Sequence, residues 1–84
     1  MGELAKLPNI GTVVETQLNQ AGIETAEQLK AIGSKQAWLK IKAIDPSACY
    51  NRLCGLEGAI QGIRWHHLAD DVKKDMKDFY RKMR

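Results

Sequence analysis

The chain has 84 residues, of which 44% are hydrophobic and 27% charged, the composition of a single ordinary soluble domain. Its net charge is +3, and the basic excess is spread along the chain, so charge favours solubility and identifies no partner. There is no charged leader before an apolar run and no apolar stretch of ~18 residues, so we expect a cytoplasmic protein that neither spans nor binds a membrane.

The first third of the chain carries signals for two short helices. Thr12 and Glu15 have the spacing of a capping box, which predicts a helix that begins near Thr12. Thr25 and Gln28 have the same spacing and predict the start of a second helix. The apolar residues expected to face the core are Ile10, Val14, Leu18 and Ala21, then Ala26, Leu29 and Ile32. The residues expected to end the two helices are Gly22 and Gly33.

Two further helices are predicted in the middle of the chain. Ser34 is the expected cap of the third helix, and Asp45-Pro46 has the cap-then-proline pattern of the start of a fourth. The third helix should bury Ala37, Trp38, Ile41 and Ile44, and the fourth Cys49, Leu53, Leu56, Ile60 and Ile63. Three glycines interrupt the fourth pattern and predict the close approach of another helix: Gly55, Gly58 and Gly62.

The last helix should run from about Ala69 to Met83, with acidic residues in its first turn and basic residues in its last. Its expected buried face is Val72, Met76, Phe79 and Met83, with Leu68 ahead of them. No β-branched run alternates with period two. We therefore expect an all-α fold, a compact single domain over residues 1–84 with about five short helices.

The segment before the first helix has the form of a helix-hairpin-helix turn. In that motif, backbone N–H groups at a tight turn and at the following helix start bind a phosphate. Candidate nucleic-acid contacts are therefore Asn9, Ile10, Gly11 and Thr12. Asn9 stands where the motif usually has glycine, and asparagine tolerates positive φ. From Pro8 to Leu29 there is no Lys or Arg and three glutamates, so this segment opposes a phosphate electrostatically.

An ordered set of motifs is similar to the C-terminal domain of the TfoX/Sxy family. It comprises Leu7-Pro8-Asn9-Ile10-Gly11, Ala21-Gly22-Ile23, Leu56-Glu57-Gly58-Ala59 and Gly62-Ile63-Arg64-Trp65 with Leu68, over roughly residues 4–83. The resemblance implies a small helical domain that opens with a helix-hairpin-helix-like unit, here in stand-alone form. It also implies a regulatory role without enzymatic activity, because proteins of this family are linked to natural competence, the uptake of DNA.

The cysteines and histidines do not form a convincing site in the sequence. Cys49 and Cys54 are five positions apart, about 140° around a helix, and the neighbouring His66 and His67 also diverge. Metal binding, a disulfide and cysteine-based catalysis are therefore all disfavoured. Since a chain of this length has a thin core, we also expect no cofactor and no cleft for a small-molecule substrate.

Two surface segments remain as candidates for interactions. A candidate protein interface consists of Arg64, Trp65, His66 and His67, since arginine and tryptophan are favoured in interfaces. The alternative is that Trp65 packs on the core while both histidines face solvent. In the basic C-terminal segment, Lys77 and Arg81 are candidate phosphate contacts, and the alternative is a solvated helix face.

The sequence thus leaves two main functional hypotheses, and a third, a small enzyme that uses Cys54 with His66 or His67, is the least supported. The first is a non-enzymatic interaction module that binds an unidentified protein or another copy of itself. The second is weak, sequence-independent DNA binding, in which the hairpin backbone meets a phosphate and the C-terminal basic residues add charge.

Overall fold

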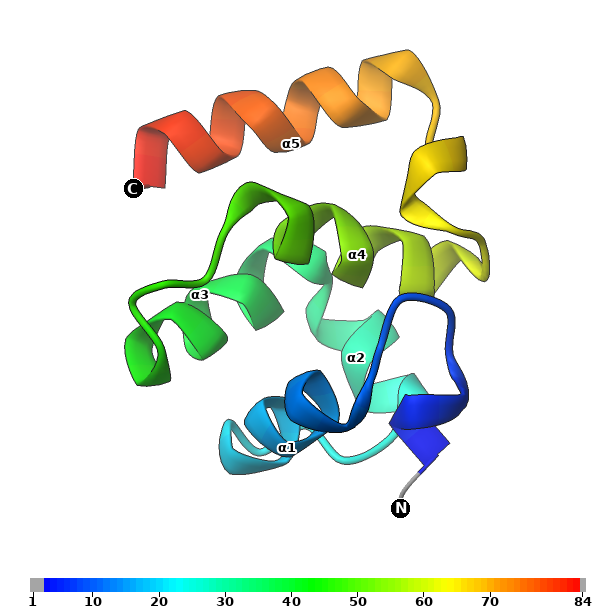
Figure 1. The fold of residues 1–84 in the computed structure, drawn as a ribbon, viewed down its shortest axis with the longest axis vertical. Helices are drawn as coiled ribbons and strands as arrows, with labels where there is room; N and C mark the ends of the chain where they lie inside the picture. Colours follow the sequence, from blue (N-terminus) through cyan, green and yellow to red (C-terminus); the bar gives the residue numbers. More distant parts are fainter. Residues whose placement is uncertain (1–2, 84) are drawn as a thin grey trace.

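Helix α4 (Tyr50–Gln61) lies at the centre of the molecule, between α5 on one side and α1 and α2 on the other (Figure 1). The computed structural model describes residues 3–83. The regular elements in this range are all helices, joined by short turns, and none is a strand. The other elements, in chain order, are η1 (Glu3–Lys6), α1 (Thr12–Gln20), α2 (Ala26–Ile32), α3 (Ser34–Ile44), η2 (Trp65–His67) and α5 (Asp70–Met83), where η denotes a 3-10 helix. The all-α prediction with five helices is confirmed.

The core is built around Trp38 in α3, whose side chain is fully buried. Phe79 and Tyr80 of α5 meet its indole edge-on, with ring centroids 6.0 and 5.7 Å away. The indole N–H donates a 3.2 Å hydrogen bond to the carbonyl oxygen of Cys49, so the one polar atom of this side chain is satisfied. Other core residues on the predicted apolar stripes are Leu18, Leu29, Ala37, Ile41, Leu53, Leu56 and Met76.

The helix boundaries show where local sequence signals determined the backbone. At Thr25 both halves of the predicted capping box are present: its side chain accepts the N–H of Gln28, and the Gln28 side chain accepts the N–H of Thr25. Gly22 has φ of +87° and follows α1, as predicted. The capping box at Thr12 is wrong. Gly11 is the N-cap of α1, and the Glu15 side chain points into the molecule, where it accepts the N–H of Ala5 at 3.0 Å.

Two other boundary predictions also need correction. Ser34 does not cap the third helix: Gly33, which ends α2 as predicted, is also the N-cap of α3. Ser34, the first residue of α3, is buried and donates its hydroxyl to Glu57 at 2.7 Å. Asp45 ends α3 rather than beginning α4, because its carboxylate accepts the N–H and hydroxyl of Ser47 in a local turn. The fourth helix therefore begins only at Tyr50.

Some residues placed in the core or in a helix by periodicity lie outside it. Ile44 and Met83, at the last positions of α3 and α5, are 44% and 40% exposed, so the predicted apolar stripe of each helix does not stay buried to the helix end. Gly62 caps the C-terminus of α4 in the left-handed conformation instead of lying inside the helix. Cys49 and Ile63 likewise flank α4. Over residues 3–83, no helix is long and apolar enough to cross a membrane.

Candidate interaction surface at the Asn9 turn

The side chain of Asn9 ties the turn between η1 and α1 to the far half of the chain. Its Nδ2 donates to the carbonyl oxygens of Gly55 and Ile63, at 3.3 and 3.0 Å, and its Oδ1 accepts the N–H of Trp65 at 3.2 Å. The residue has φ of +69°, the conformation for which asparagine is tolerated. The side-chain amide of Asn9 therefore points inward, and its Nδ2 and Oδ1 are both engaged in hydrogen bonds within the domain. A ligand at the turn would form its polar contacts with the backbone of Asn9 rather than with this amide.

This contact also explains why residue 58 of α4 is a glycine. A Cβ added at Gly58 would lie 2.6 Å from Nδ2 of Asn9 and 2.7 Å from the carbonyl oxygen of Ile63. At Gly55 the nearest atom would be 3.4 Å away, which is ordinary contact. A close approach to α4 was predicted, but the approaching group is the Asn9 turn and the segment after α4, not another helix.

The hydrogen bond from Trp65 to Asn9 places two predicted groups side by side: the turn (residues 9–12) and the segment around η2 (residues 64–67). We call these residues together the turn surface. Gly11, Thr12 and Arg64 are exposed, whereas Ile10 is buried and can offer only its backbone. Trp65 is half-buried and stacks on His66 with ring centroids 4.1 Å apart, and both histidines are exposed.

The first turn of α1 adds unpaired donors to this surface. The N-cap Gly11 supplies no side-chain acceptor, and the N–H groups of Thr12, Val13 and Val14 make no hydrogen bond within residues 3–83. Val13 is 66% exposed. The surface thus combines free amides, an exposed valine and an exposed arginine.

A groove of about 320 Å³ opens beside the turn surface. Two arginines line it, and no carboxylate does among the described residues. Its lining is Asn9, Val14, Cys49, Asn51, Arg52, Gly55, Leu56, Arg64 and Trp65. We call it the arginine groove.

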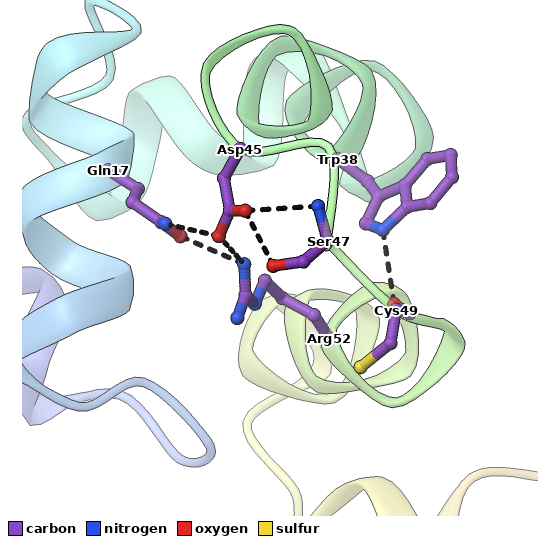
Figure 2. Close-up of polar contacts among 6 residues, drawn as sticks. All are labelled: Gln17, Trp38, Asp45, Ser47, Cys49 and Arg52. Atoms are coloured by element: carbon purple, nitrogen blue, oxygen red, sulfur yellow. Dashed lines mark hydrogen bonds and ion pairs between the residues drawn. The ribbon is translucent and has the colours of Figure 1, made fainter. Parts of the chain in front are cut away.

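Arg52, one of the residues that line this groove, belongs to a polar cluster that sequence analysis missed (Figure 2). Its Nη1 donates to Asp45 at 3.0 Å and to Gln17 at 3.2 Å, and Gln17 donates to Asp45 at 3.0 Å. Hydrogen bonds from the Ser47 hydroxyl and from Arg52 hold the pKa of Asp45 well below its usual range. Asp45 and Ser47, two residues apart, have the spacing of an Asx turn, which was a usable signal. Arg52 had none.

The acidic residues of the hairpin lie away from the turn. Glu15 is 4% exposed, and its carboxylate faces η1. Glu24 and Glu27 are exposed near the start of α2, beyond the far end of the nine-residue α1, about 13 Å along its axis. The charge of −3 counted along the sequence is therefore not concentrated at residues 9–12.

Lys77 and Arg81 are exposed on α5, which lies on the opposite side of α4 from α1 (Figure 1). The structure therefore unites residues 9–12 with residues 64–67 but not with these two basic residues. A single phosphate-binding face made of the hairpin and the C-terminal basic edge does not exist in this fold.

The two cysteines occupy different environments. Cys49 is the exposed N-cap of α4, whereas Cys54 is buried, and burial raises the pKa of its thiol. A thiol with a raised pKa is a poor nucleophile, because the thiolate is the reactive form. Within residues 3–83, no three His, Cys, Asp or Glu side chains gather as they would around a metal ion.

The fold and the turn surface together define the class of protein: a small all-helical domain with a helix-hairpin-helix-like turn. The chain belongs to the family of the TfoX C-terminal domain, whose model matches residues 1–80. It is similar to Protein Sxy of Escherichia coli (strain K12), with 35% identity over 60 residues. That match covers 71% of this chain and 29% of Sxy, so the chain spans less than a third of that relative.

Two crystal structures from Listeria monocytogenes share this fold. One, in a triclinic form, is of an uncharacterized protein with 49% identity and a TM-score of 0.94, covering 95% of this chain and 91% of that one. The other, in a tetragonal form, is of a protein of unknown function with 48% identity and a TM-score of 0.94, covering 96% and 99%. The predicted family is thus confirmed.

Proposed function

We propose that this domain is a non-enzymatic regulatory module that binds a protein partner through the turn surface. The observation that carries the proposal is the bond between Asn9 and Trp65, which joins two exposed segments into one surface. That surface offers Val13, Trp65 and Arg64, a mixture of apolar area and charge that suits a protein interface. We also propose that this role belongs to the regulation of competence, and the similarity to Protein Sxy supports this part of the proposal.

The test compares the wild-type domain with Arg64→Glu as baits in a lysate of the source cells at physiological salt. Lys30→Glu, a charge reversal at an exposed site on α2, is the matched control. We expect one protein to be recovered by the wild type and Lys30→Glu but not by Arg64→Glu, and to bind the purified domain directly in calorimetry. Sedimentation equilibrium tests whether the partner is a second copy. A monodisperse monomer that enriches no protein would contradict the proposal.

A second candidate function is weak, sequence-independent DNA binding at the same surface. The observation that favours it is the set of free N–H groups at the start of α1 beside the exposed Arg64. These are the donors and the charge that a phosphate requires. Because Lys77 and Arg81 lie on the other side of α4, they should add little to a contact at this surface.

Fluorescence anisotropy with a short labelled duplex, at about 50 mM and 200 mM salt, tests this alternative. Gly11→Val is the informative variant, because Gly11 has extended backbone (φ −98°) and a Cβ there meets nothing within 4 Å. If DNA binds the turn, Gly11→Val and Arg64→Gln weaken it and the double variant Lys77→Gln/Arg81→Gln does not. No binding at low salt, or loss only in the double variant, would contradict DNA binding at the turn.

A further inference from the structure

We propose that the arginine groove seats an acidic segment of the partner protein, with a carboxylate on the two guanidinium groups and a neighbouring apolar side chain on the groove floor. The inference rests on the proposed protein-binding function and names the chemistry of the partner. It concerns Arg52 and the groove wall, which lie beyond the turn surface itself.

Arg52 is prepared for such a carboxylate. Only its Nη1 bonds to other residues within residues 3–83, so Nε and Nη2 present a free edge of the guanidinium. Figure 2 shows these two nitrogens without partners among the residues drawn. Asp45 and Gln17 hold the group from one side, and its side chain is only 23% exposed. An arginine fixed in this way loses little conformational freedom when its other edge binds a carboxylate in bidentate fashion.

The charge balance of the groove selects a ligand with a small negative charge. Asp45 neutralises one of the two arginines, and Arg64 makes no ion pair within residues 3–83. The excess is therefore about one positive charge. Since no carboxylate lines the groove, a single aspartate or glutamate of the partner completes the pairing without repulsion.

The rest of the lining is suited to an apolar neighbour of that carboxylate. Leu56 is buried at the groove, and Val14 and Trp65 are half-buried along it. The volume of about 320 Å³ is at the lower end of the ~300–1,000 Å³ of ligand pockets, which suits one or two side chains. A ligand that offers a carboxylate to the arginines and a neighbouring apolar side chain to this lining is a short peptide motif with one acidic and one apolar residue.

The same features favour a peptide over nucleic acid in this groove. Affinity for nucleic acid grows with the number of phosphates neutralised, and only one free positive charge is available here. Beside the groove the charge is mixed rather than basic: Asp70 and Asp71 are exposed at the start of α5, and Lys73 donates to the carbonyl oxygen of His66 in η2 at 2.9 Å.

A second copy of this chain is the alternative occupant of the groove. In a two-fold dimer, an exposed acid of each copy could reach the groove of the other, because residue i of one copy meets residue j of its partner and the reverse. Sedimentation equilibrium separates the two occupants: a dimer of the wild type that is lost in Arg64→Glu would overturn the assignment to a separate partner protein.

The test uses a series of terminally blocked nonapeptides, each with one central glutamate and one leucine, and the position of the leucine next to the glutamate differs from peptide to peptide. Each peptide has a matched control in which glutamine replaces the glutamate. Binding is followed by NMR through the Arg52 Nε–H and Trp65 indole N–H resonances of the intact domain. We expect glutamate peptides, and not glutamine peptides, to shift both resonances. Arg64→Glu should weaken this binding at least tenfold, while Lys77→Glu, on the opposite side of α4, leaves it unchanged.

Three outcomes would overturn the groove assignment: glutamate and glutamine peptides behave alike, Arg64→Glu binds as well as the wild type, or a short duplex shifts the same resonances at lower concentration than any peptide. Failure of the groove and failure of the proposed function are distinguishable. If a captured partner binds but no peptide does, and that partner also binds Arg52→Gln at full strength, the protein-binding function stands and the groove assignment falls. If neither partner nor peptide binds, both fall.

Discussion

The Asn9 turn and helix α5 are both exposed regions of the same small molecule, yet different forces hold them. The turn is fixed by polar bonds from one asparagine to backbone groups 46 to 56 residues away. Helix α5 is held by apolar and aromatic packing on Trp38, with one ion pair between Lys35 and Asp75 at 2.8 Å. The comparison teaches that a helix face follows from its own periodicity, whereas the turn acquires its neighbours only through long-range contacts.

The two regions also differ in how their charges are arranged. Helix α5 carries five basic and four acidic residues, which alternate along the helix and leave a net charge of +1. The turn surface has fewer charges, but it adjoins a groove in which two arginines are gathered. Variants that weaken one region and spare the other can test this division.

Trp38→Ala should have the largest effect. Removing a fully buried indole leaves a cavity and should cost about 3–5 kcal/mol of unfolding free energy, measured by urea denaturation. Because α5 packs on Trp38, the loss of the indole should loosen α5 more than α1. In the folded fraction of the variant, the backbone amide protons of α5 should therefore exchange with solvent faster than those of α1. Trp38→Phe keeps most of the packing and serves as the milder variant. If α5 stayed as protected as in the wild type, packing would not be what holds it.

Asn9→Ala should have the second-largest effect, a loss of about 2–4 kcal/mol of unfolding free energy. The substitution removes three hydrogen bonds and leaves three partly buried backbone groups without their partner. Asn9→Gly is the matched variant: it accepts the positive φ and removes only the amide. We expect it to be less destabilised than Asn9→Ala and still unstable relative to the wild type in the same urea assay. Wild-type stability in Asn9→Gly would show that the amide bonds are not what fixes the turn.

Gly58→Ala and Gly55→Ala form a pair that tests the same junction from the other side. At Gly58 the added methyl meets Asn9 and the backbone of Ile63, so overpacking outweighs a helix-propensity gain of ~1 kcal/mol, for a net loss of about 1–2 kcal/mol. At Gly55 the space is ordinary, and stability should be unchanged or slightly increased. Thermal denaturation followed by circular dichroism compares the two. Equal effects at both sites would argue against the close approach at Gly58.

The smallest effect should come from Asp45, the residue that positions Arg52. Its folded-state pKa lies below its unfolded value, so its stabilising contribution is present above an ordinary aspartate pKa of about 3.9 and is lost as pH falls below that. The difference in melting temperature between wild type and Asp45→Asn should therefore be constant above about pH 5 and shrink as pH falls from about pH 4 toward pH 2, as far as both proteins remain folded. Asp78→Asn, at an exposed position of α5, is the control. A constant difference across this range would contradict the stabilisation of the Asp45 carboxylate by Ser47 and Arg52.

The sequence by itself determined the helical content, the apolar stripes and the boundaries set by local signals, such as the capping box at Thr25 and the positive-φ Gly22. These features depend on residues within a few positions of one another, so a single chain segment contains the information. The sequence also carried the family motifs, including Asn9 and the glycines of α4, without revealing that they touch.

Only the tertiary structure decided which exposed residues share a surface. It turned the amide of Asn9 inward, buried Glu15, separated Lys77 from the turn and brought Arg52 and Arg64 to one groove. Each of these outcomes depends on how helices pack across the core, and packing joins residues whose separation along the chain leaves no local pattern. The shape of the candidate site is therefore a property of the folded domain, and the sequence indicated only some of its components, Arg64 and Trp65 but not Arg52.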